Sequence, residues 1–96
     1  MYGDWNCEVE TPFGKENYKI SLEENKAVIK HHTGNVLVDD VEYIDNKFFL
    51  KKKMDFPITC SVFISGVVDD EKITGSIYVD DYLKVKFIGE YHAINI

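Results

Sequence analysis

The chain has 96 residues, with 17 acidic and 11 basic side chains and a formal net charge of −6 at pH 7. This length predicts one domain, residues 1–96, around one compact core. A hydrophobic content of 45% with 14% aromatics excludes disorder. No apolar run approaches the roughly 20 residues of a membrane span. The acidic charge argues against nucleic acid as a partner, because phosphate binding needs a basic face and the only basic run is 51–53.

The first ten residues lack the basic and apolar regions of a secretory signal, so we expect a cytoplasmic protein with no membrane partner. The two cysteines, Cys7 and Cys60, are too far apart for a C-x-x-C motif, and both fall on predicted inward faces of strands. Buried cysteines commonly behave as small hydrophobic residues. We therefore expect free thiols rather than a disulfide.

Alternating apolar and polar side chains in the first half of the chain predict four strands. In chain order they span residues 3–10, 17–23, 26–32 and 36–43. The first ends in the turn signal Thr-Pro-Phe-Gly, in which proline fixes φ and glycine accepts positive φ. The fourth loses its alternation at Asp39-Asp40, where a β-bulge would restore a single buried face.

A two-residue loop at 24–25 joins the second and third predicted strands. Such a loop pairs residues whose numbers add to a constant, here 49. The register then places Ile20 opposite Ile29 and Tyr18 opposite His31. Because apolar residues meet apolar residues, the hairpin prediction is internally consistent.

The second half of the chain predicts four more strands. They span residues 47–53, 57–68, 73–79 and 83–91. The same counting pairs Tyr43 with Phe48 and Ile64 with Ile77. The inward glycines have two interpretations: they allow the strands to coil into a narrow barrel, or they leave space for a ligand. These glycines are Gly66, Gly75 and Gly89.

Eight short strands with short connections and no helical periodicity predict an all-β fold. An eight-stranded antiparallel up-and-down meander barrel is favoured over an open sandwich, because closing the sheet removes its exposed edges. The paired acids at 39–40, 69–70 and 80–81 predict solvated turns rather than calcium ligands, since aspartate favours turns through local hydrogen bonds.

Short motifs along the whole chain carry a family resemblance. They are G-x-W at Gly3 and Trp5, T-P-x-G from Thr11 to Gly14, a proline at Pro57, I-x-G at Ile73 and Gly75, and F-x-G at Phe87 and Gly89. This outline resembles the calycins (lipocalins, fatty-acid-binding proteins and avidins), and most closely a group of short, largely uncharacterised bacterial calycin-like proteins. The resemblance implies a small barrel for an apolar ligand, without a reaction to transfer.

Three polar side chains share the inward phase at one end of the expected barrel: Tyr18, His31 and Lys52. In one interpretation Tyr18 and His31 hydrogen-bond each other, while Lys52 extends to water. In the other they form a ligand site, in which Lys52 holds a carboxylate, His31 donates or accepts a hydrogen bond and Tyr18 orients the ligand. Apolar loop residues such as Phe13 at the same end favour either a ligand entrance or a self-association surface.

We expect no metal site. His31 and His32 are adjacent on a predicted strand, so their side chains should point to opposite faces and not reach one ion together. Nucleophile-elbow, phosphate-loop and dinucleotide glycine motifs do not occur in the sequence, so we assign no catalytic residue and no cofactor.

The favoured function is a non-enzymatic barrel that binds an apolar or amphipathic anionic small molecule. The first alternative is a homo-oligomeric structural or accessory protein without a ligand, and the second is a small barrel isomerase or cyclase. Phe49 and Phe63 fall on outward phases of neighbouring strands. Together they predict an apolar patch suited to a homodimer contact.

Overall fold

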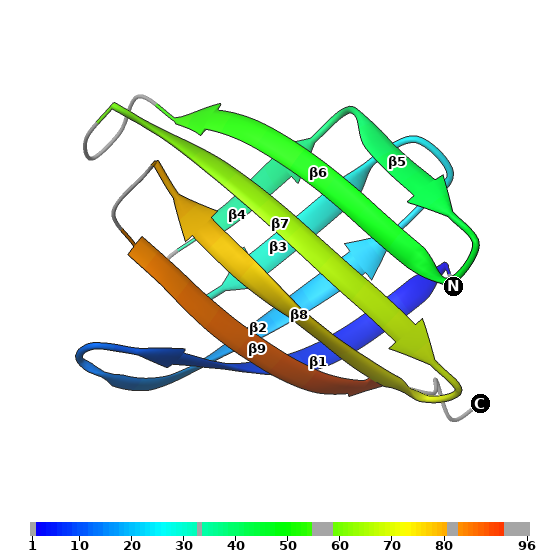
Figure 1. Cartoon of the computed structure of the whole chain (residues 1–96), viewed down its shortest axis with the longest axis horizontal. Helices are drawn as coiled ribbons and strands as arrows, with labels where there is room; N and C mark the ends of the chain where they lie inside the picture. Colours follow the sequence, from blue (N-terminus) through cyan, green and yellow to red (C-terminus); the bar gives the residue numbers. More distant parts are fainter. Residues whose placement is uncertain (1, 33, 55–58, 81–82, 92–96) are drawn as a thin grey trace.

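The computed structural model describes residues 2–32, 34–54, 59–80 and 83–91. Over these ranges it is all-β, with nine antiparallel strands in a nearly closed barrel (Figure 1). The strands are β1 (Gly3–Thr11), β2 (Gly14–Leu22), β3 (Ala27–His31), β4 (Gly34–Val38), β5 (Val41–Ile44), β6 (Lys47–Met54), β7 (Cys60–Asp69), β8 (Lys72–Val79) and β9 (Leu83–Tyr91). No helix long and apolar enough to cross a membrane is found in these ranges.

The nine strands form one sheet in the order β4-β3-β2-β1-β9-β8-β7-β6-β5. Strands that follow one another in the chain are neighbours, except β4 and β5, which lie at opposite edges. The first strand pairs with the last, Trp5 opposite Tyr91 and Val9 opposite Phe87. The sheet curls so that β4 lies against β6, which leaves the barrel's seam between these two strands.

The expected single strand over 36–43 is wrong, and this is why the strand count is nine and not eight. The chain leaves the sheet at Asp39-Asp40 instead of bulging, and β5 resumes on the opposite edge. Both aspartates are exposed, whereas Val38 and Val41 on either side are buried. The broken alternation therefore reflects a corner in the chain. Two short strands each bury one face, and the chain turns at the two aspartates between them.

The predicted registers are confirmed. Ile20 pairs with Ile29, and Ile64 pairs with Ile77. Tyr43 also stands directly opposite Phe48. The β2–β3 ladder ends at Lys19 and Lys30, one residue before the fourth predicted pair, Tyr18 and His31. Because the side-chain period of a strand is two, a correct register also fixes which residues face the core.

The β1–β2 hairpin is longer than expected, since β2 begins at Gly14 and not near residue 17. Thr11 pairs with Gly14 across a two-residue loop. The Thr11 hydroxyl donates to the Gly14 carbonyl at 2.7 Å and accepts from the Phe13 amide at 3.2 Å. At the tip of this hairpin the Phe13 side chain is 99% exposed. The turn signal is thus confirmed, and the ladder extends directly up to it.

Trp5 is buried near the start of β1, with 2% of its surface exposed, as its phase predicts. The Tyr91 ring packs edge-on against it, with centroids 5.2 Å apart. Gly3 has a φ of +131°, and a Cβ atom there would lie 2.7 Å from the Tyr91 ring. The G-x-W motif therefore has a physical basis: the glycine leaves space for the aromatic pair that closes this end.

Two of the inward glycines lie beneath aromatic rings. A Cβ atom on Gly66 would lie within 2.5 Å of the Phe48 ring, and one on Gly75 would overlap the Phe87 ring and the Ser65 carbonyl. Phe48 is fully buried. The space at these glycines is filled by side chains, so the interpretation that they leave space for a ligand is wrong at these two positions.

Other expectations are met locally. Cys7 and Cys60 are free thiols, Cys7 buried and Cys60 half-buried. Asp45, Asp70 and Asp80 adopt positive φ in turns, as expected for solvated turn residues. The predicted start of the sixth strand at residues 57–58 lies outside the described residues, and β7 is observed from Cys60.

Candidate functional site

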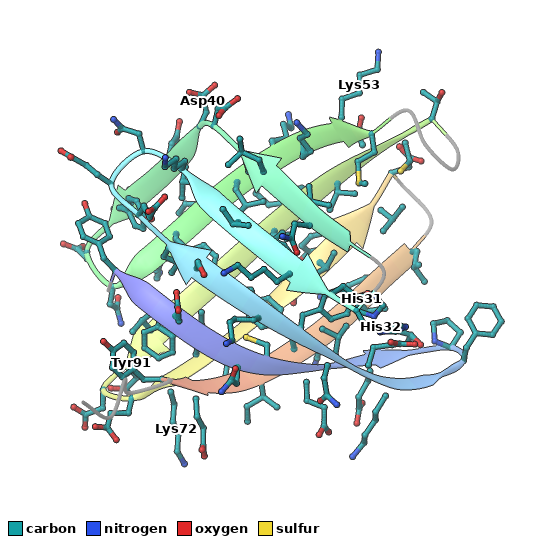
Figure 2. All side chains as sticks on the ribbon, turned by 180° about the vertical axis from the view of Figure 1, so that it is seen from behind. His31, His32, Asp40, Lys53, Lys72 and Tyr91 are labelled. Atoms are coloured by element: carbon teal, nitrogen blue, oxygen red, sulfur yellow. The ribbon has the colours of Figure 1, made fainter. Side chains whose placement is uncertain are left out.

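The two ends of the barrel differ. We call the end that holds the start of β1, the end of β9 and the β2–β3, β5–β6 and β7–β8 turns the Trp5 end. The opposite end, with the β1–β2, β3–β4, β6–β7 and β8–β9 connections, is the His31 end. Figure 2 shows Tyr91 at the first and His31 and His32 at the second.

The inward side chains near the His31 end are only partly buried. Five aliphatic residues in this group pack on the core without being enclosed by it: Ile29, Val36, Val62, Ile77 and Val85. On the same strands, the next inward positions towards the Trp5 end are almost completely buried, for example Ala27, Val38 and Ile64. Along these five strands the inward side chains are therefore more exposed towards the His31 end, whereas near the Trp5 end Val68 and Tyr43 are the partly buried ones.

Tyr18 and His31 meet across the β2–β3 hairpin, as the register predicts. Their rings stack with centroids 4.5 Å apart and an interplanar angle of 25°. The His31 Nε2 atom forms a hydrogen bond with Glu16, at 2.9 Å from the Glu16 Oε2 atom. A carboxylate only accepts hydrogen bonds, so Nε2 carries the proton in this contact. Tyr18 and His31 thus meet through their stacked rings, and Glu16 holds the Nε2 atom of His31.

His32 lies beside His31, with ring centroids 4.0 Å apart. The expectation that adjacent histidines point to opposite faces is wrong here, because β3 ends at His31 and the alternation of a strand does not continue into the following turn. One ligand atom each from Glu16, His31 and His32 lies within 4.8 Å of the others. The geometric reason for excluding a metal ion is therefore removed.

Lys52 is separate from this group. It lies on β6 opposite Val62, half-buried, and it shares the inward phase with the buried residues Phe48 and Leu50. Its strand is across the seam from β4, whereas Tyr18 and His31 lie on β2 and β3. The structure brings two of the three predicted residues into contact and leaves the third on another strand of the same end.

A surface hollow of about 780 Å³ lies over β9, β1, β2 and β3. Tyr18, His31 and His32 contribute to its lining, but Lys52 does not. Much of the remaining lining comes from outward-phase polar residues of both charges, including Lys19 and Glu8. The hollow therefore borders the histidines at the surface, and inward-phase residues such as Cys7 and Gly89 also contribute to its lining.

The electrostatics of the site are set by Glu16. Burial raises the pKa of the Tyr18 hydroxyl, and the Glu16 carboxylate raises it further. Tyr18 therefore stays protonated at neutral pH and can donate a hydrogen bond. Since Glu16 also pairs with His31, a carboxylate already occupies this side of the His31 end.

Outside the barrel, Phe49 and Phe63 stack with centroids 6.4 Å apart, and Tyr78 lies 6.0 Å from Phe63. The Lys84 ammonium lies over the Tyr78 ring. All three aromatic side chains are half-buried on the outer face of β6, β7 and β8. This aromatic cluster is the outward patch that the sequence predicts.

Comparison of the chain with protein-family models, with curated proteins and with solved structures gives no match. The resemblance to calycins therefore stays a prediction. Any function has to be inferred from the residues and their arrangement.

Sequence reasoning missed Glu16 and His32. The signal for Glu16 was present: it lies two residues before Tyr18, on the same face of β2, and the hairpin register places it diagonally across from His31. The alternating pattern alone starts the second strand at residue 17, one residue after Glu16. The position of the His32 ring depends on where β3 ends, and the alternating pattern does not show that boundary.

Proposed function

We propose that this protein is a non-enzymatic, calycin-like barrel that binds a small amphipathic molecule with an anionic group at the His31 end. The observation that carries the proposal is the partial exposure of the inward aliphatic side chains at that end. Apolar side chains that face a barrel interior without being enclosed favour burial of an apolar ligand. Filled space at the Trp5 end limits the ligand to the other half of the barrel.

Lys52 supports an anionic ligand group. It is the inward-phase lysine of this end, and a half-buried ammonium holds a carboxylate more strongly than an exposed one does. His31 is paired with Glu16, whose charge repels an anion. We therefore assign the anionic group to Lys52, with Tyr18 and His31 on the facing side as polar contacts.

Titration of an environment-sensitive fluorescent fatty acid into wild type and Lys52→Met tests this assignment. Interactions with charged groups contribute about 1.5–3 kcal/mol, which predicts a loss of affinity of at least about tenfold. The matched control is Lys53→Met, because Lys53 is the exposed neighbour on the opposite face of β6. Equal affinity of wild type and Lys52→Met would remove Lys52 from the site, and equal weakening by both variants would indicate a non-specific charge effect.

A homo-oligomeric accessory protein is the second candidate, and the outer aromatic cluster of Phe49, Phe63 and Tyr78 favours it. A homodimer through this cluster would be detected by sedimentation velocity, and a Phe63→Ser variant should then sediment as a monomer. A monomeric wild type at high concentration would contradict it. The isomerase or cyclase alternative and the bacterial, cytoplasmic location stay predictions.

A further inference from the structure

We propose that Glu16, His31 and His32 form a binding site for a divalent transition-metal ion of the zinc type, at the rim of the His31 end. One oxygen and two imidazole nitrogens are a ligand set that Zn²⁺ uses in three-ligand sites with an open position. One candidate atom from each residue already lies within 4.8 Å of the other two. The site does not include Lys52, but it shares His31 with the proposed ligand site.

The distances suit a tetrahedral ion after small side-chain rotations. Bonds of about 2.0–2.2 Å to nitrogen and oxygen place tetrahedral ligand atoms roughly 3.4 Å apart. The His31 Nε2 and Glu16 Oε2 atoms, 2.9 Å apart, need to separate slightly, and His32 has to approach. His32 is exposed and the Glu16 side chain is 40% exposed, so both can rotate.

The third ligand is held in position. The His31 side chain is only 15% exposed, with Tyr18 stacked on it and His32 against it. A metal ion would take the place of the proton that His31 now shares with Glu16, so the same carboxylate that orients the imidazole becomes a ligand. Preorganisation of one histidine reduces the ordering needed when the ion binds.

The surroundings leave room for the remaining coordination positions. His31 and His32 both line the outer hollow of about 780 Å³, so water or a small ligand can reach an ion held there. The hollow carries the acidic residues Glu8 and Glu90 as well as lysines. Its two carboxylates are matched by two lysines, Lys19 and Lys30, so no excess positive charge opposes the entry of a cation.

Isothermal titration calorimetry with ZnCl₂ on tag-free, chelator-treated protein tests the site. We expect one Zn²⁺ per chain. Removal of a residue that only supports a metal ligand costs about 10–100-fold in affinity, so Glu16→Gln and His32→Gln should each weaken binding at least about tenfold. The matched control is Glu10→Gln, an exposed carboxylate opposite Lys15 in the same hairpin. Lys52→Met should bind Zn²⁺ like wild type, so a failure of the proposed fatty-acid site and a failure of the metal site can be told apart.

Two further measurements identify the residues that bind the metal ion. Co²⁺ in place of Zn²⁺ should give visible absorption without a thiolate-to-metal band, because the site contains no cysteine. Imidazole NMR signals of both His31 and His32 should shift on adding Zn²⁺. Absence of Zn²⁺ binding to wild type, unchanged affinity in Glu16→Gln and His32→Gln, or a thiolate band that points to Cys60 would each overturn the proposal.

Discussion

The Trp5 end and the His31 end are built from the same strands with the same alternation, yet one is filled and the other is partly accessible. At the Trp5 end large aromatic side chains fill the interior, with Trp5 2% exposed and Phe48 fully buried against Gly66. At the His31 end the inward positions hold medium-sized aliphatic and polar residues, such as Val62 and Lys52, that stay partly exposed. Alternation decides which residues face inward, whereas their size decides whether the interior is full.

The two ends also differ in how their turns are tied together. At the Trp5 end, backbone amides of Val41, Val68 and Tyr91 donate to carbonyls in three separate turns. The Tyr43 hydroxyl adds a bond to the Glu23 carbonyl. At the His31 end, among the described residues, Asp80 and Ser61 link the end of β8 to the start of β7 through two bonds of 2.8 Å. These bonds tie the turns of the Trp5 end to the neighbouring strands.

The largest expected effect is at Trp5. Replacing a fully buried tryptophan with alanine removes its contacts and leaves a cavity, so Trp5→Ala should lower the free energy of unfolding by about 3–5 kcal/mol. Chemical denaturation measures this loss. Phe13→Ala, at a 99% exposed position, should change stability by less than about 0.5 kcal/mol. A Trp5→Ala protein as stable as wild type would contradict the claim that buried side chains at the Trp5 end stabilise the fold.

A smaller effect is expected at Tyr43, which ties β5 to the β2–β3 turn. Tyr43→Phe removes its hydrogen bond to the Glu23 carbonyl and should cost about 1 kcal/mol at neutral pH. Burial, with smaller contributions from Tyr2 and Glu23, raises the pKa of Tyr43 from 10.0 to about 12.

The free energy of unfolding at alkaline pH tests the contribution of Tyr43 in a second way. Because the pKa is higher in the folded than in the unfolded protein, the stabilisation is complete below pH 10 and is lost as the pH rises through about 12. Wild type should therefore lose more stability than Tyr43→Phe over this window. Cys7, whose pKa burial raises from 9.0 to about 12, titrates in both proteins and cancels from the difference. If the stability of wild type and of Tyr43→Phe fell in parallel with pH, the Tyr43 hydroxyl would not be bonded to the Glu23 carbonyl in the β2–β3 turn.

Much of the fold could be predicted because hairpin registers and alternation are local properties. The pairing of Ile20 with Ile29 follows from a two-residue loop, and the burial of Trp5 follows from its phase. The corner at Asp39-Asp40 could not be predicted in the same way. A bulge and a corner break the alternation alike, and only the contact of β4 with β6 across the seam distinguishes them.

The site was only partly predictable for a related reason. The meeting of Tyr18 with His31 follows from the register, so it was predicted. The contact with His32 and the separation of Lys52 depend on where β3 ends and on how far the sheet curls. Neither property is encoded in the alternation of a single strand.

Methyl-resolved NMR during titration with a fatty acid tests most directly the claim that the ligand binds inside the His31 end. The predicted result is that methyl signals of Val36, Val62 and Val85 shift with a common saturation, while those of Leu22 and Ile73 at the filled end do not. Shifts confined to exposed outer-surface methyls, such as those of Leu37, Ile44 and Ile88, would contradict the account.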